Sequence, residues 1–156
     1  MSEIFKFQEN TIDRKDIKVG HYLKIVENDG TVKFTCVTDV GAVKTGKHGS
    51  AKTTVEAKDV NTGNSRNLIL VANDRATIVK MIKVNVKLFD FIDDTMSIRD
   101  DKNNCIEINV KDSMSAEDKS KINEIVSSNE AADEFDLTIR ALPGFYKLDS
   151  IKPVFN

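Results

Sequence analysis

The stretch VKTGKHGSAKTTVEAKDV, residues 43–60, contains a glycine-rich basic loop followed by an alternating pattern. Counted from Gly41, the loop has the Gly-x-x-x-x-Gly-Lys spacing of a phosphate-binding loop. That type of loop needs a Ser or Thr after its lysine and a helix whose amide groups hold phosphate, but His48 follows Lys47. From Ala51 onward, polar residues alternate with apolar or small ones, which predicts a β-strand and therefore a β-hairpin.

Glycines and lysines dominate the tip of this predicted hairpin. Gly46 and Gly49 supply the backbone freedom that a tight tip needs, and Lys47 between them is expected to project furthest from the strands. Lys44 and Lys52 add positive charge nearer the base, and the loop contains no Asp or Glu. Such a tip can contact RNA phosphates or can be a solvated basic turn, and the loop alone leaves both interpretations open.

Short alternating segments on both sides of the loop predict antiparallel strands. HYLKIV and TVKFTCV meet across the turn ENDG, and NTGNS leads into NLILVA and RATIVKMI. Short strands at this spacing, without a helical stretch, predict a small antiparallel barrel. The pattern of the strand before the loop places these residues on one face: Val32, Phe34, Cys36 and Val40. The pattern of the strand after it places these on one face: Ala51, Thr53, Val55 and Ala57.

The second half of the chain predicts another small barrel. IKVNVKLFDFI alternates from residue 82, and MSIRD, CIEINV and FDLTIRA supply further strands. SMSAEDKSKINEIVSSN is the one credible helix, because Ser115 lies three residues before Asp118, as in a capping box. Four or five strands with one late helix predict a Greek-key barrel of the OB type. Three aromatic residues are expected in its core: Phe89, Phe91 and Phe135.

These patterns divide the chain into three parts. Residues 1–16 are polar and unpatterned and are predicted to be a flexible N-terminal arm. Residues 17–82 form the first barrel, which carries the loop 43–52, and residues 83–156 form the second. The first 82 residues contain 13 Lys and Arg against 10 Asp and Glu, and residues 83–156 contain 10 against 15, which together give the net charge of −2. A polyanionic partner is therefore expected on the first barrel.

Composition favours a soluble globular protein, with 156 residues of which 40% are hydrophobic and 31% charged. The longest apolar run, Leu68–Ala72, is too short to cross a membrane, and the first residues lack the apolar core of a secretory signal, so a cytoplasmic location is predicted. Cys36 and Cys105 lie in alternating apolar stretches and are predicted to be buried thiols. His21 and His48 are far apart and no Cys-x-x-Cys is present, so no metal site is predicted.

The loop KTGKHGSAK, residues 44–52, resembles the modification loop of the eukaryotic and archaeal translation factor 5A family, relatives of bacterial elongation factor P. The resemblance is close over residues 17–63 and rests on length and strand order thereafter. It implies an SH3-like barrel followed by an OB-fold domain. The chain departs from many eukaryotic members where it reads Phe34-Thr35-Cys36 instead of Pro-Cys-Lys, and it carries a serine at position 50 as archaeal members do.

The resemblance implies that Lys47 becomes hypusine, through deoxyhypusine synthase, which transfers an aminobutyl group from spermidine, and deoxyhypusine hydroxylase. It further implies a factor that binds the ribosomal exit site and positions peptidyl-tRNA beside ribosomal RNA, which promotes peptide-bond formation at proline runs and assists termination. Such a factor is not an enzyme and needs no cofactor. The loop residues that the resemblance places against RNA are Lys44, Thr45, Gly46, His48, Gly49, Ser50, Ala51 and Lys52.

Two other functions are compatible with parts of the sequence. The first is a general RNA-binding barrel module with an unmodified basic hairpin loop. The second and weaker alternative is a nucleotide-binding enzyme that uses Gly41, Gly46 and Lys47.

Overall fold

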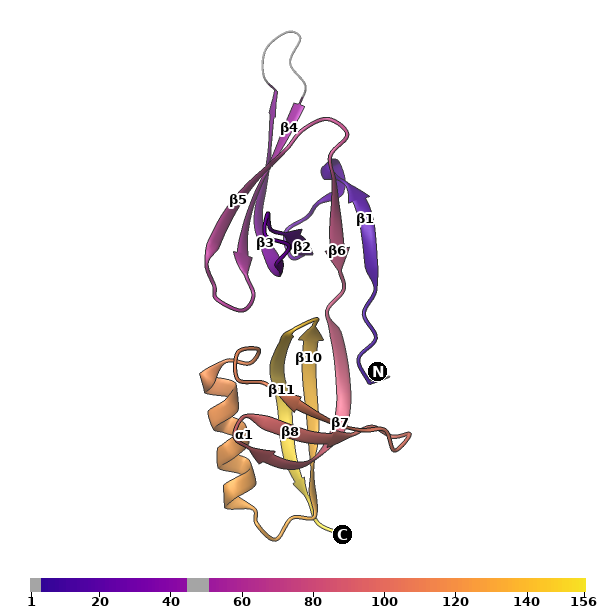
Figure 1. Cartoon of the computed structure of the whole chain (residues 1–156), viewed down its shortest axis with the longest axis vertical. Helices are drawn as coiled ribbons and strands as arrows, with labels where there is room; N and C mark the ends of the chain where they lie inside the picture. The colour runs from indigo at the N-terminus through magenta and orange to yellow at the C-terminus, as the bar shows by residue number, and fades with distance from the viewer. Residues whose placement is uncertain (1–3, 45–50) are drawn as a thin grey trace. The chain divides into compact units, whose positions relative to one another are not determined.

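The computed structural model describes residues 4–44 and 51–156, apart from the side chain of Lys44 (Figure 1). The chain divides into two compact units, each with its own antiparallel sheet. The first unit is Phe7–Lys80, and the second combines Met1–Lys6 with Met81–Asn156. The predicted fold class, a mainly β protein with two small barrels and one helix, is confirmed for the described residues.

The first unit contains a six-stranded sheet in the order β1-β6-β2-β3-β4-β5. Strands β2 to β5 follow one another as antiparallel hairpins, as the turn residues predicted. Its buried centre is small and aliphatic and includes Ile17, Leu23, Val37 and Val55. The elements are β1 (Glu9–Asp13), the 3₁₀-helix η1 (Arg14–Asp16), β2 (Tyr22–Val26), β3 (Val32–Lys44), β4 (Ala51–Asp59), β5 (Ser65–Leu70) and β6 (Arg75–Val79).

Strand β1 lies where the sequence predicted an unstructured arm over residues 1–16. It pairs antiparallel with β6 from Glu9 opposite Val79 to Asp13 opposite Arg75. The pattern missed it because β1 is at the edge of the sheet and its first three residues are exposed and polar. An edge strand with so little buried apolar surface has almost no hydrophobic period to detect.

The prediction for the face of β3 is right for Phe34 and Val40 but wrong for Val32 and Cys36, and the strand contains a bulge. Val32 is exposed and Cys36 only half-buried, whereas Thr35 and Val37 are fully buried. The pairing with β4 shifts register between Val37 and Asp39, which leaves an extra residue on β3. A bulge reverses the alternation along a strand, so Val37 and Val40 both pack in the core although they are three residues apart.

Strand β4 follows the predicted alternation. Thr53, Val55 and Ala57 are buried, and Glu56 and Lys58 are exposed. This strand occupies the place where a phosphate-binding loop requires a helix. The nucleotide-site interpretation of the loop is therefore wrong in its main structural requirement.

The second unit contains a five-stranded sheet in the order β11-β10-β7-β8-β9. Its first strand in the chain pairs with both the second and the fourth, as in the predicted OB-type Greek key. Val86, Leu88, Met96, Ile98 and Ile139 are among its buried core residues. The elements are β7 (Ile82–Ile92), β8 (Thr95–Arg99), β9 (Cys105–Asn109), α1 (Ala116–Ser128), β10 (Glu134–Leu142) and β11 (Phe145–Val154).

The predicted helix is present as α1 and begins at the predicted residue. The Ser115 hydroxyl accepts the backbone N–H of Asp118 at 3.1 Å and so caps the helix. The Asp118 carboxylate accepts the backbone N–H of Leu148 at 3.0 Å, which ties the first turn to β11. Ile122 is fully buried against the sheet. The cap thus fixes both the start of the helix and its attachment.

Two side chains of the second unit differ from the prediction. Cys105, at the start of β9, is exposed, so it is not a buried thiol. Phe91 and Phe135 are buried as predicted, but Phe89 is 41% exposed. Phe89 follows the buried Leu88 and faces outward in the alternation of β7, and the register shift after Leu88 brings Phe91 rather than Asp90 into the core. In the described part of the chain, no helix is long and apolar enough to span a membrane.

Candidate functional site

The candidate site is the β3–β4 hairpin and the loop that it carries. The two strands pair from Thr35 opposite Asp59 to Lys44 opposite Ala51, so both are hydrogen-bonded up to the ends of the loop. The hairpin is the longest paired segment of the first unit (Figure 1). Six of the predicted site residues lie outside the described residues: Thr45, Gly46, Lys47, His48, Gly49 and Ser50.

The remaining predicted site residues lie at the end of the paired strands. Ala51 is directly opposite the backbone of Lys44, and Lys52 is opposite Val43. Ala51 and Lys52 are both half-buried, and Val43 is exposed. The structure therefore brings Lys44, Ala51 and Lys52 together in two adjacent cross-strand pairs.

In the fourth cross-strand pair from the loop, a glycine lets the two strands approach closely. Gly41 is opposite Thr54, and a Cβ atom placed on Gly41 would lie 2.7 Å from the Thr54 hydroxyl oxygen. That separation is well inside van der Waals contact, so only glycine fits without a shift of Thr54. Gly41 is the first glycine of the phosphate-loop spacing in the sequence, but its role in the structure is steric.

A buried arginine supports the same end of the hairpin, and the sequence analysis missed it. Arg14, in η1, is only 7% exposed, and its Nη1 donates to the hydroxyl of the buried Thr53 at 3.0 Å. A buried guanidinium is stable only where its donors are hydrogen-bonded. Because Arg14 follows a polar segment with no pattern, its partner 39 residues later could not be found from the sequence.

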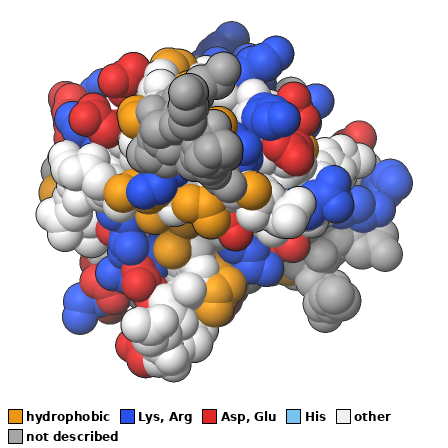
Figure 2. All heavy atoms as spheres, turned by 90° about the horizontal axis from the view of Figure 1, so that it is seen from above, with side chains coloured by type: hydrophobic (Ala, Val, Ile, Leu, Met, Phe, Trp, Pro, Cys, Tyr) orange, Lys and Arg blue, Asp and Glu red, His pale blue; other side chains and the backbone are white. Residues whose placement is uncertain are grey.

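The outer face of the sheet near the loop is partly apolar. Val43 and Ile69 are both exposed, and Ile69 pairs with Thr54 on the neighbouring strand. Figure 2 shows hydrophobic side chains close together in the middle of the face that it views, with basic and acidic side chains around them. The residues next to the loop are therefore not uniformly basic.

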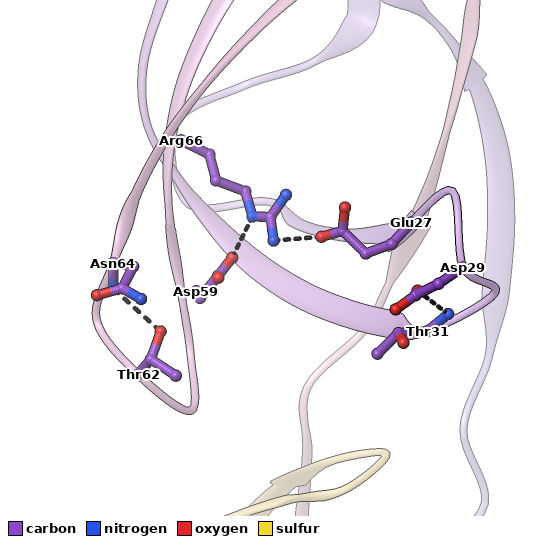
Figure 3. A network of polar contacts seen from close by, with 7 residues as sticks. All are labelled: Glu27, Asp29, Thr31, Asp59, Thr62, Asn64 and Arg66. Atoms are coloured by element: carbon purple, nitrogen blue, oxygen red, sulfur yellow. Dashed lines mark hydrogen bonds and ion pairs between the residues drawn. The ribbon is translucent and has the colours of Figure 1, made fainter.

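The opposite end of the hairpin is held by an arginine between two carboxylates (Figure 3). Arg66 on β5 donates from Nε to the buried Asp59 carboxylate at 2.6 Å and from Nη2 to Glu27. The hydrogen bond to Asp59, followed by that to Glu27, raises the pKa of Arg66 above its ordinary value. The network joins the β2–β3 and β4–β5 turns and so fixes the end of the hairpin distant from the loop.

No group of three or more His, Cys, Asp or Glu that could hold a metal ion occurs among residues 4–44 and 51–156. The charged residues that the structure brings together at the far end of the hairpin are ion-paired, and near the loop the described part of the hairpin presents the Lys52 side chain and the strand backbone. Its arrangement suits a projecting contact element.

Comparison with solved structures finds the same fold along almost the whole chain. The translation initiation factor eif-5a family protein from Naegleria fowleri matches over 92% of this chain and 98% of its own, with 21% identity and a TM-score of 0.69. The eukaryotic translation initiation factor 5A from Methanococcus jannaschii matches over 92% of this chain and 95% of its own, with 16% identity and a TM-score of 0.59. No protein-family model and no curated protein sequence matches the chain. The chain thus has the two-barrel fold of these proteins.

Proposed function

We propose that this chain is a translation factor of the 5A family that acts on the ribosome through a hypusine at Lys47. The loop sequence KTGKHGSAK and the likeness of fold to two factors of that name support the family. The observation that carries the proposal is the hairpin register, which keeps β3 and β4 paired up to Lys44 and Ala51. A loop that follows directly from two anchored strand ends can present a cationic side chain to an RNA-lined site.

The proposed mechanism is positioning rather than chemistry. Deoxyhypusine synthase extends the Lys47 side chain from spermidine and deoxyhypusine hydroxylase completes it, which lengthens a flexible cation and keeps its charge. In the ribosomal exit site, the extended side chain orders the acceptor end of peptidyl-tRNA and so favours peptide-bond formation at proline runs and termination. The factor works in the cytoplasm and is not an enzyme. Eight residues would contact RNA beside it: Lys44, Thr45, Gly46, His48, Gly49, Ser50, Ala51 and Lys52.

The modification itself is tested by intact-protein and peptide mass spectrometry on the protein purified from its native host. We expect the mass of hypusine or deoxyhypusine on the peptide that contains Lys47. An unmodified Lys47 in that material contradicts the proposal. If that unmodified protein still binds ribosomal RNA, the chain is instead a general RNA-binding barrel module.

The role of the modification is tested by Lys47→Arg, which keeps the positive charge but cannot accept the aminobutyl group. In a reconstituted translation assay on a proline-run message, we expect this variant to leave synthesis at the level measured without the factor. Lys58→Arg, at an exposed position of β4 outside the loop, is the matched control and should retain rescue. Full rescue by Lys47→Arg would refute the mechanism.

A further inference from the structure

The second unit has an open groove of about 870 Å³, whereas the candidate loop belongs to the first unit. Its walls come from β7, β10 and β11, from the end of β8 with the loop that follows it, and from the N-terminal segment. Five basic side chains line it: Lys6, Lys83, Lys87, Arg99 and Lys152. The proposed function assigns no role to this groove.

Basic side chains are concentrated in the groove, although its unit is acidic. Residues 83–156 contain 10 Lys and Arg and 15 Asp and Glu, and residues 1–6 add one of each, so the unit has 11 against 16, or −5. The lining contains five of the 11 bases and three acids, Asp100, Asp101 and Asp136, and two further acids, Glu134 and Asp149, pair with lining bases, so the charges at the groove balance. On a unit that is otherwise acidic, this balanced surface repels an anionic ligand least.

The bases of the groove differ in how they are paired. Lys83 lies 3.3 Å from Asp149, Arg99 lies 3.3 Å from Glu134, and Lys87 pairs with Asp136. Lys6 and Lys152 are exposed and have no carboxylate partner in the part of the chain that the structure describes. Partly exposed pairs contribute little stability, so an incoming phosphate can compete for their cations.

One acidic residue of the lining, Asp100, accepts hydrogen bonds from residues of its own turn. The Asp100 carboxylate accepts the side-chain amide of Asn104 at 2.7 Å and the backbone N–H groups of Asn104 and Lys102. The hydrogen bond from the Asn104 side chain is the main cause of a lowered pKa of Asp100. Asp100 therefore stays ionised, and the donors of its own turn, rather than a ligand, use its oxygens.

A flat stacking surface adjoins the basic side chains. The Arg99 guanidinium carbon lies 5.0 Å from the centre of the Phe89 ring, and Phe89 is 41% exposed. The Nε of Arg99 is buried and has no hydrogen-bond partner among the described residues. Planar guanidinium and phenyl groups are surfaces on which single-stranded bases stack, whereas a phosphate or an acidic peptide would use the guanidinium but not the exposed phenyl ring.

We propose that this groove is a binding site for single-stranded RNA, in which Lys6 and Lys152 contact phosphates and the Arg99–Phe89 pair stacks a base. The floor adds polar groups, since Thr138 donates to the side-chain oxygen of Asn85 at 2.7 Å and leaves the Asn85 amide free to donate. OB-type barrels generally bind along their second and third strands, here β8 and β9, whereas this groove lies mainly on β7, β10 and β11.

The test is fluorescence anisotropy of a labelled 12-nucleotide single-stranded RNA with the full-length, unmodified chain at several salt concentrations. We expect Lys6→Glu combined with Lys152→Glu to weaken binding at least tenfold and to reduce the salt slope by about one to two, because two phosphate contacts are lost. Phe89→Ala should weaken binding about fivefold or more through the lost stacking surface. Lys152→Glu alone is compared with Lys121→Glu, an exposed lysine on α1 outside the groove, which is its charge-matched control and should change binding little.

Three results would overturn the inference. The first is binding by the groove variants equal to that of Lys121→Glu, with Lys47→Ala abolishing it; RNA binding would then belong to the loop, and the proposed function would stand. The second is equal displacement of the RNA by polyglutamate, which would indicate a site for acidic peptides. The third is no binding by the wild-type chain. Thermal melts and Lys152→Ala alone separate loss of binding from loss of folding.

Discussion

At the scale of single residues, the hairpin depends on a buried cation that lies far from it in sequence. Arg14 is buried beside Thr53, and the two are joined by a hydrogen bond of 3.0 Å. The contact holds η1 against the strand that leads out of the loop. Both partners are buried. Removing one therefore lowers the free energy of unfolding mainly because the other is left buried without a hydrogen-bond partner.

We expect Arg14→Met to lower the free energy of unfolding of the first unit by about 1–3 kcal/mol. Methionine keeps much of the length of the side chain but removes the donor to Thr53. Lys15→Met, at an exposed neighbouring position, is the control and should change stability by less than about 0.5 kcal/mol. Chemical denaturation measures both, and equal stabilities of the two variants would show that the Arg14–Thr53 contact contributes nothing.

At the scale of elements, β3 and β4 show what a local pattern can predict. β4 keeps its alternation for nine residues, so its buried face was predicted from the sequence. β3 loses its alternation at the bulge between Val37 and Asp39, so the same reasoning combined buried and exposed residues on one predicted face. Helix α1 was predicted with its first residue because its cap is local, formed by Ser115 and the backbone three residues later.

At Gly41, the close approach of β3 and β4 leaves no room for a side chain. We expect Gly41→Ala to destabilise the first unit by about 1–3 kcal/mol, because the new Cβ atom would lie 2.7 Å from the Thr54 hydroxyl. The same substitution in a Thr54→Ala background should cost much less, since the clashing atom is gone. A double-mutant cycle by thermal unfolding gives the coupling, and purely additive effects would contradict the steric explanation.

At the scale of the whole molecule, the N-terminal segment contributes to both units. Ile4 and Phe5 pack on the core of the second unit, where Phe5 meets Tyr146 edge to face with ring centres 5.4 Å apart. Residues 9–13 then form β1 of the first unit. Burial raises the pKa of Tyr146, so its ring lies in an apolar environment that residues from the opposite end of the chain help to build.

We therefore expect Phe5→Ala to lower the stability of the second unit by about 1–3 kcal/mol, although its strands begin more than 70 residues later. Phe155→Ala removes an exposed ring from the same unit and is the control. Hydrogen exchange followed by mass spectrometry on peptides from β10 reports on this unit alone. Equal protection in the two variants would show that the N-terminal segment is not part of the core.

The sequence by itself determined the fold class, the turns, the helix with its cap and the loop that supports the proposed function. All of these rest on contacts within a few residues, such as hydrophobic period, glycine in turns and side-chain capping. Tertiary structure alone decided the role of β1, the bulge of β3, the burial of Arg14 and the gathering of bases from both ends of the chain into one groove. Those features depend on partners that lie tens of residues away in the sequence. Contacts between such distant residues leave no hydrophobic period along the chain from which they could be predicted. Their physical cause is burial and close approach in three dimensions.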